Sequence, residues 1–165
     1  MLLKFNNLLV MTIAAFLSSS ICAQGVITEK NLSLAMAQNI ANGAMAKCQQ
    51  LGYKISVTVV DRAGLAIVML HDDGAGLHTS ESSDRKAYTA LTFHAPSADL
   101  EKRVHDNDSA AQGQKTYTRV LALAGGLPIK VGNDVIGAIG VSGTPGKDNV
   151  CAQAGIDNVI SKATP

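Results

Sequence analysis

The chain has 165 residues, of which 47% are hydrophobic, 16% are charged and 4% are aromatic. This length and composition indicate one folded domain and exclude a disordered chain. Fourteen basic and thirteen acidic residues give a net charge of +1, so the basic excess of a nucleic-acid-binding protein is absent, as is a polybasic membrane patch. With no tryptophan, the sequence also offers few aromatic side chains on which bases could stack.

The first 23 residues have the pattern of a secretory signal peptide. Lys4 supplies the positive start, an apolar run covers 8–17, and the small residue Ala23 closes the segment. The apolar run is too short to cross a bilayer, which takes about 20 residues. We therefore expect cleavage after Ala23, a periplasmic or secreted domain over 24–165, and no membrane attachment after cleavage.

Cysteine usage supports two alternatives for the exported domain. Cys22 would leave with the signal, unless it carries a lipid anchor, which the bulky Ile21 before it disfavours. The remaining pair, Cys48 and Cys151, would enter an oxidising compartment in which a disulfide is stable. A bridge requires Cα atoms within about 7 Å, which spacing along the chain does not decide. The alternative is two buried, unlinked thiols.

Hydrophobic periodicity predicts four helices. The first is expected to begin after an N-cap at Thr28 and to end at Gly52, because apolar residues recur between them at spacings of three and four. A second helix covers 79–92. Ser97 caps a short third helix and Asp148 caps the last.

Strand-like composition occurs in five segments, at 55–60, 65–70, 119–124, 127–131 and 135–141. Short turns at 61–64 and 132–134 join two pairs of these segments as hairpins. Hairpins imply antiparallel pairing, with the helices packed against the sheet. The residues alone therefore predict a single α/β (α+β) domain.

Glycines and polar residues gather in two segments that are candidates for ligand binding. One is the loop 71–78, which leads into a helix whose first N–H groups attract anions. The other is a glycine pair that permits close backbone approach to a ligand. The alternatives are a solvated loop and a plain tight turn. The predicted ligand-binding residues are Asp73, Gly74, His78, Lys86, Gly125 and Gly126.

Imidazole and carboxylate groups in the same region form a candidate haem or metal site. The predicted ligands are His71, His78, Glu81 and Asp84. The last three recur every third residue and would lie on adjacent turns of one helix. Haem iron would take one histidine as its axial ligand. The alternative is a hydrated surface cluster, because two carboxylates and one imidazole lack a fourth ligand.

A family resemblance rests on segments in a fixed order, at 59–64, 73–75, 86–90, 125–129, 135–143 and 151–155. Together they resemble the GlcG/HbpS haem-binding (haem-degrading domain) family, which is related to the C-terminal module of PduO-type proteins. The resemblance implies a profilin-like fold, with an antiparallel sheet of about five strands between helices, and a homo-oligomer. It also implies haem or iron as the cofactor, and Glu81-Ser-Ser-Asp84 is loosely similar to an iron-associated Glu-x-x-Glu.

Three functions are therefore considered. The first is an exported small-molecule-binding protein for haem, a related tetrapyrrole or iron. The second is an enzyme acting on a small carboxylate or carbonyl compound, in which Lys86 fixes the anion and His78 moves protons near Gly125-Gly126. The third is an oligomeric accessory protein without chemistry of its own. Binding is favoured because no complete catalytic constellation, nucleophile motif or nucleotide loop is present.

Overall fold

The structure is a computed structural model that describes residues 25–163, so the predicted signal peptide lies outside the described residues. The helices are α1 (Leu34–Gln50), α2 (Thr79–Phe93), α3 (Ser97–His105), α4 (Ser109–Gln114) and α5 (Asp148–Ala163). The strands are β1 (Ser56–Asp61), β2 (Ala66–His71), β3 (Gly126–Val131) and β4 (Asp134–Ser142). None of the described helices is long and apolar enough to span a membrane.

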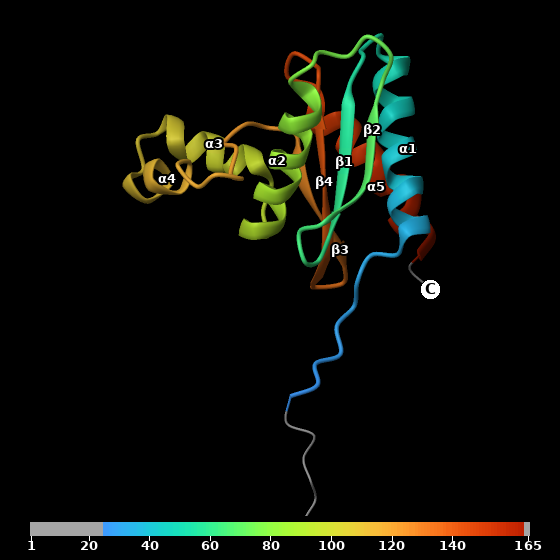
Figure 1. Cartoon of the computed structure of the whole chain (residues 1–165), viewed down its shortest axis with the longest axis horizontal. Helices are drawn as coiled ribbons and strands as arrows, with labels where there is room; N and C mark the ends of the chain where they lie inside the picture. Colours follow the sequence, from blue (N-terminus) through green and yellow to red (C-terminus); the bar gives the residue numbers. More distant parts are fainter. Residues whose placement is uncertain (1–24, 164–165) are drawn as a thin grey trace, which may run out of the picture.

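The four strands form one antiparallel sheet in the order β2-β1-β4-β3. Helices α1 and α5 cover one face of the sheet and α2 covers the other (Figure 1). This confirms the predicted α/β fold with an antiparallel sheet between helices and both predicted hairpins, with four strands in place of about five.

The predicted strand at 119–124 is wrong. The segment crosses the outer side of α2, where the backbone N–H of Leu121 donates to the hydroxyl of Thr89 at 2.9 Å. The guanidinium of Arg85 donates to the carbonyl of Val120 at 3.0 Å. Side chains of α2 thus form the hydrogen bonds with backbone groups that a neighbouring strand would otherwise form.

Helix α1 begins later than predicted. Ser33, not Thr28, is the N-cap, and its hydroxyl accepts a hydrogen bond from the backbone N–H of Met36 at 3.2 Å. The preceding segment is held on the sheet instead, because Asn31 Oδ1 accepts from the backbone N–H of Arg62 at 3.1 Å. The predicted end of the helix is confirmed, with Gly52 at φ +80°.

The face covered by α1 and α5 holds the main apolar core, to which β1 contributes Val57 and Val59. The two helices approach closely because residue 155 is glycine, and a Cβ there would lie 2.4 Å from the carbonyl oxygen of Ile40. Cys48 and Cys151 are both fully buried between these helices and form a disulfide, with Cα atoms 5.5 Å apart.

The face covered by α2 has a different interior. Ser56 and Thr58 alternate with the valines of β1 and point toward α2, where the Thr58 hydroxyl bonds the Ser83 hydroxyl at 2.8 Å. The helix lies directly on β4 because residue 140 is glycine, and a Cβ there would lie 2.0 Å from the carbonyl oxygen of Ser83. The helix is therefore fixed by polar pairs as well as by apolar contact.

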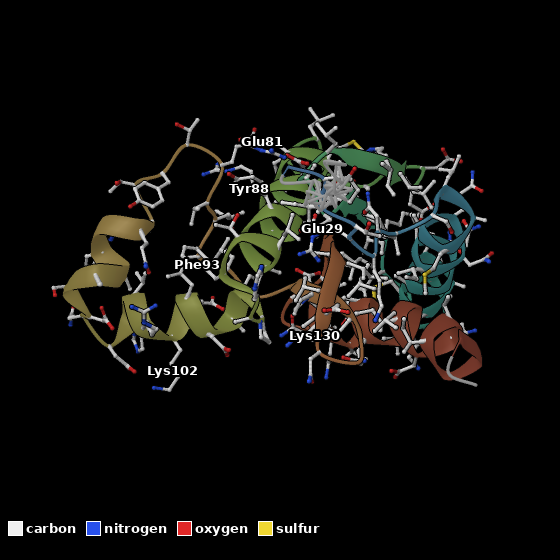
Figure 2. All side chains as sticks on the ribbon, turned by 90° about the horizontal axis from the view of Figure 1, so that it is seen from below. Glu29, Glu81, Tyr88, Phe93, Lys102 and Lys130 are labelled. Atoms are coloured by element: carbon white, nitrogen blue, oxygen red, sulfur yellow. A yellow bond between two sulfur atoms is a disulfide. The ribbon has the colours of Figure 1, made fainter. Side chains whose placement is uncertain are left out.

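Residues 97–124 form an arm that extends away from the sheet (Figure 1). The short helix α4, which periodicity did not predict, is capped by Asp108, whose carboxylate accepts from the backbone N–H of Ala111 at 3.0 Å. A small apolar cluster of Leu100, Ala111 and Val120 holds the arm together, and Phe93 packs against it from the end of α2 (Figure 2).

Candidate functional site

A cleft of about 530 Å³ opens where β4 ends and α2 begins. Three segments form it, namely the start of β1, the loop from β2 to α2, and the turn from β4 to α5. Its lining residues are Lys54, Gly74, Gly76, His78, Thr79, Ser142, Gly143, Thr144, Pro145 and Asp148. Antiparallel pairing of Ser56 with both His71 and Ser142 brings these three segments to the same end of the sheet.

His78 and Lys54 supply an unengaged imidazole and an unengaged ammonium to the cleft. The His78 ring lies against Gly76, where a Cβ would be 3.0 Å from Cε1 and 3.2 Å from Nδ1. Gly74 has φ +79°, and a Cβ there would lie 3.5 Å from Cδ of Lys54. Within the described residues, neither the His78 imidazole nor the Lys54 ammonium has a hydrogen-bond or ion-pair partner. Both groups are exposed and free to meet a ligand.

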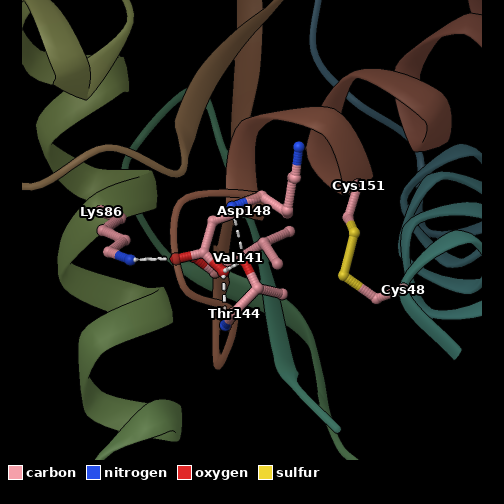
Figure 3. The surroundings of a disulfide bond; sticks show 7 residues. Cys48, Lys86, Val141, Thr144, Asp148 and Cys151 are labelled. Carbon is pink, nitrogen blue, oxygen red and sulfur yellow. Dashed lines mark hydrogen bonds and ion pairs between the residues drawn. A yellow bond between two sulfur atoms is a disulfide. The ribbon is translucent and has the colours of Figure 1, made fainter. Parts of the chain in front are cut away.

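Lys86 is not available to a ligand, contrary to its predicted binding role. Its ammonium is 2.7 Å from Oδ2 of Asp148 and donates to the carbonyl of Val141 at 3.2 Å, with both charged side chains almost fully buried (Figure 3). Asp148 Oδ1 accepts from the backbone N–H and the hydroxyl of Thr144 at 3.0 and 2.9 Å. This network fixes the turn that forms one wall of the cleft.

The glycine pair 125–126 also has a packing role. A Cβ on Gly125 would lie 2.5 Å from the carbonyl oxygen of Val141, and one on Gly126 would lie 2.1 Å from that of Lys86. The close approach that these glycines permit is therefore taken up by the protein's own backbone, not by a ligand. Asp73 is exposed and is not among the cleft residues. Of the six predicted binding residues, Gly74 and His78 line the cleft.

His71 belongs to a chain of hydroxyl groups beneath the cleft. Thr79 donates to the carbonyl of Gly76 at 2.7 Å, so the Ser56 hydroxyl, 2.7 Å from Thr79 Oγ1, must donate to Thr79. Nδ1 of His71 lies 2.8 Å from Ser56 Oγ and 3.1 Å from Ser80 Oγ. This ring nitrogen is therefore engaged by hydroxyl groups of the protein itself.

The predicted carboxylate ligands do not converge with the histidines. Glu81 pairs with Arg85 at 3.3 Å, and Asp84 pairs with Arg119 at 3.3 Å. Over residues 25–163, no three or more His, Cys, Asp or Glu side chains are arranged to hold a metal ion. The spacing of three along α2 placed these groups on neighbouring turns, but each carboxylate faces a cation instead.

Sequence reasoning missed Lys54, the turn 142–145 and Asp148 as cleft residues. The signal for them was indirect, because pairing the strand-like segments 55–60 and 135–141 as neighbours brings position 54 beside position 143. A Cβ on Gly143, which has φ +134°, would lie 2.6 Å from the carbonyl oxygen of Lys54. Hydrophobic periodicity does not reveal which strands pair when they are not consecutive in sequence.

The sheet between two helical layers, with a cleft at one end, defines a small α/β protein of the fold that the resemblance implied. The chain belongs to the family described as haem degrading protein HbpS-like, whose sequence model matches residues 32–157. The predicted family is thereby confirmed.

Known relatives agree with this assignment. A double mutant of HbpS from Streptomyces reticuli is 36% identical with a TM-score of 0.74, over 79% of this chain and 88% of that one. PduOC, whose crystal structure is of a haem complex, is 26% identical with a TM-score of 0.73, over 78% of this chain and 95% of that one. An uncharacterised 15.0 kDa protein of Citrobacter freundii is 31% identical over 128 residues, which are 76% of this chain and 90% of the relative.

Proposed function

We propose that this protein binds haem in the cleft between the β2–α2 loop and the β4–α5 turn. The observation that carries the proposal is the pairing of an unengaged imidazole, His78, with an unengaged ammonium, Lys54, in one cleft of a protein from this family. PduOC, a relative with the same fold, was crystallised with haem.

The groups in the cleft suit the two polar parts of haem. An imidazole is the common axial ligand of haem iron, and an ammonium pairs with a propionate. The cleft volume of about 530 Å³ lies within the range of about 300–1,000 Å³ usual for small-molecule pockets. Pro145 lines the cleft, and Leu77, next to His78 in sequence, is 97% exposed, so apolar surface is available for the ring edge.

The chain's own residues then have distinct roles. His78 would hold the iron, Lys54 would orient a propionate, and the Lys86–Asp148 pair would keep the turn 144–148 in position. When bound, the haem itself would supply a redox-active iron. We assign the axial position to His78 rather than His71 because His78 lines the cleft, whereas His71 is bound to the hydroxyl chain beneath it.

The test is a haemin titration of the purified protein followed by absorbance. We expect a saturable Soret band that His78→Ala shifts and weakens by about tenfold in affinity, a loss of about 1.4 kcal/mol. Lys54→Met should weaken binding less, because a surface charge pair is worth about 1 kcal/mol or less. His105→Ala, an exposed histidine on the arm, is the matched control and should bind as the wild type does. A wild-type spectrum in His78→Ala would remove this ligand from the proposal, and the absence of any saturable band would refute the function.

We also propose that the protein is exported to the periplasm or secreted. The signal-like pattern over 1–23 supports this, as does the Cys48–Cys151 disulfide, which is typical of oxidising compartments. Cell fractionation with N-terminal sequencing should find a chain that begins at Gln24 outside the cytoplasm. A cytoplasmic chain that retains Met1 would contradict export.

A homo-oligomer also remains part of the proposal, on the resemblance alone. Light scattering during size-exclusion chromatography measures it directly, and a monomer at all concentrations would remove it.

A further inference from the structure

A second pocket lies at the other end of α2 from the cleft, beside the β1–β2 turn and the start of β4. Its volume is about 260 Å³, below the usual range for drug-sized ligands, so only a small molecule would fill it. The polar side chains that line it are Arg62, Tyr88, Thr92 and His94. None of them enters the haem proposal.

Two of the backbone acceptors beside this pocket are already used. The carbonyl of Val135 accepts from Nη1 of Arg62 at 3.0 Å, and the carbonyl of Gly64 accepts from Nη1 of Arg119 at 3.2 Å. Arg62 Nε is also paired with Glu29 at 2.9 Å. The guanidinium of Arg62 is thereby held in one orientation, while its Nη2 makes no hydrogen bond among the residues that the structure describes.

The side-chain donors of the pocket remain free. Over the described part of the chain, no side-chain hydrogen bond involves Tyr88, Thr92 or His94. Tyr88 and Thr92 are four residues apart and therefore lie on the same side of α2. His94 follows the helix in the left-handed conformation, at φ 53°, as its C-cap residue.

The Tyr88 ring is fixed in place from two sides. The guanidinium carbon of Arg119 lies 4.0 Å from its centroid, and a Cβ on Gly64 would lie 3.5 Å from its edge. Cation–π contact of this kind restrains the ring and adds positive charge behind it. The phenol is labelled in Figure 2 on the side of α2 that faces the arm.

We propose that this pocket, the Arg62–His94 pocket, binds a small molecule through a carboxylate. The Arg62 guanidinium can only donate hydrogen bonds, and such bonds are stronger when the accepting ligand is charged. The unpaired hydroxyls of Tyr88 and Thr92 and the ring of His94 can each donate one bond as well. Leu91, which also lines the pocket, offers contact for a compact apolar body next to the carboxylate. The two acidic side chains nearby, Glu29 and Asp84, do not line the pocket and pair with Arg62 and Arg119.

The probes are benzoate, benzamide and inorganic phosphate, titrated into the full protein and followed by amide NMR. Benzoate should shift the amide signals of Gly64 and His94 saturably at about millimolar concentration, as a ligand of roughly ten heavy atoms allows. Benzamide has the same shape without the charge, so it should bind about tenfold more weakly or not at all. Phosphate tests whether the pocket binds anions in general. If phosphate binds as tightly as benzoate, the carboxylate assignment is wrong.

Variants locate the binding. Arg62→Gln should abolish benzoate saturation, and Tyr88→Phe should weaken it about fivefold, the effect of one neutral hydrogen bond. His94→Asn is the variant that preserves the fold, because asparagine tolerates the left-handed conformation, and it should weaken benzoate about threefold or more without changing haemin binding. The site is refuted if the wild type does not bind benzoate, or if it binds benzamide with the same affinity. It is also refuted if the affinity for benzoate is unchanged in both Arg62→Gln and His94→Asn. The haemin titration of His94→Asn separates this result from any failure of the haem proposal.

Discussion

The interiors on the two faces of the sheet differ in polarity, although the same strands form both faces. The face toward α1 and α5 is apolar throughout and is crossed by a disulfide. The face toward α2 buries Ser56, Thr58 and Lys86 alongside alanines, two valines and a leucine. The apolar face tolerates any close packing of suitable volume, whereas each polar group on the other face requires a partner at a defined distance. Both pockets discussed above are bordered by α2, on the side where position is set by directional bonds.

The largest predicted effect concerns the apolar face. Replacing both Cys48 and Cys151 with alanine should lower the free energy of unfolding by about 4 kcal/mol, because the bond closes a loop across a separation of 103 residues. Urea unfolding under oxidising conditions measures it. The wild type in a reducing agent should approach the variant's midpoint. A loss under about 1 kcal/mol would show that this face does not depend on the cross-link.

The next effect concerns the buried ion pair on the polar face. Lys86→Met leaves the carboxylate of Asp148 buried without its cation, which should cost about 3–5 kcal/mol of unfolding free energy. The double variant Lys86→Met with Asp148→Asn should recover part of that loss, because it removes the unpaired charge as well. Strictly additive losses would show that the two groups act independently.

A pair of swaps at adjacent positions of β1 compares the two faces directly. Val57→Thr places a hydroxyl without a partner in the apolar core and should cost about 2 kcal/mol. Thr58→Val removes one hydroxyl from a bonded pair and should cost about 1 kcal/mol, because Ser83 can still donate to the carbonyl of Ser80. Urea unfolding decides the order, and the reverse order would contradict the contrast drawn between the faces.

The smallest effect depends on pH and is confined to the arm beyond α2. A hydrogen bond from Arg103, and then one from the backbone N–H of Ala111, lowers the pKa of Asp108 below its ordinary value of 3.8. Its contribution is therefore complete above that value and is lost as the pH falls through the lower folded pKa. Amide exchange at Ala111 should lose protection over this acid range in the wild type. Asp108→Ala should lack protection at every pH, and equal protection in both proteins would contradict the assignment.

The sequence was sufficient for local elements with a strong pattern. Alternation gave β1, and the turn 61–64 gave its hairpin, because both depend on residues close in the chain. The strand prediction failed at 119–124. This segment has a strand-like composition, but its backbone is hydrogen-bonded to Thr89 and Arg85 of α2. Tertiary contacts determine the conformation of that segment, and they cannot be inferred from its composition.

The candidate site was predictable only in part, for the same reason. His78 and Gly74 stand in a glycine-rich loop that is conspicuous in sequence. Lys86 was predicted to bind a ligand near the start of its helix, but its partner Asp148 lies 62 residues away in the chain. The packing of α2 on β4 brings these two groups together, and that packing is a property of the whole fold.

The Cys48–Cys151 bond joins the first helix of the fold to the last, so the sheet, α2 and the arm all lie inside one covalent ring. A single cut in the extended arm would open the polypeptide without releasing a fragment until the disulfide is reduced. The same topology makes this bond a late step of maturation, because Cys151 is reached only when the chain has been made as far as the start of α5.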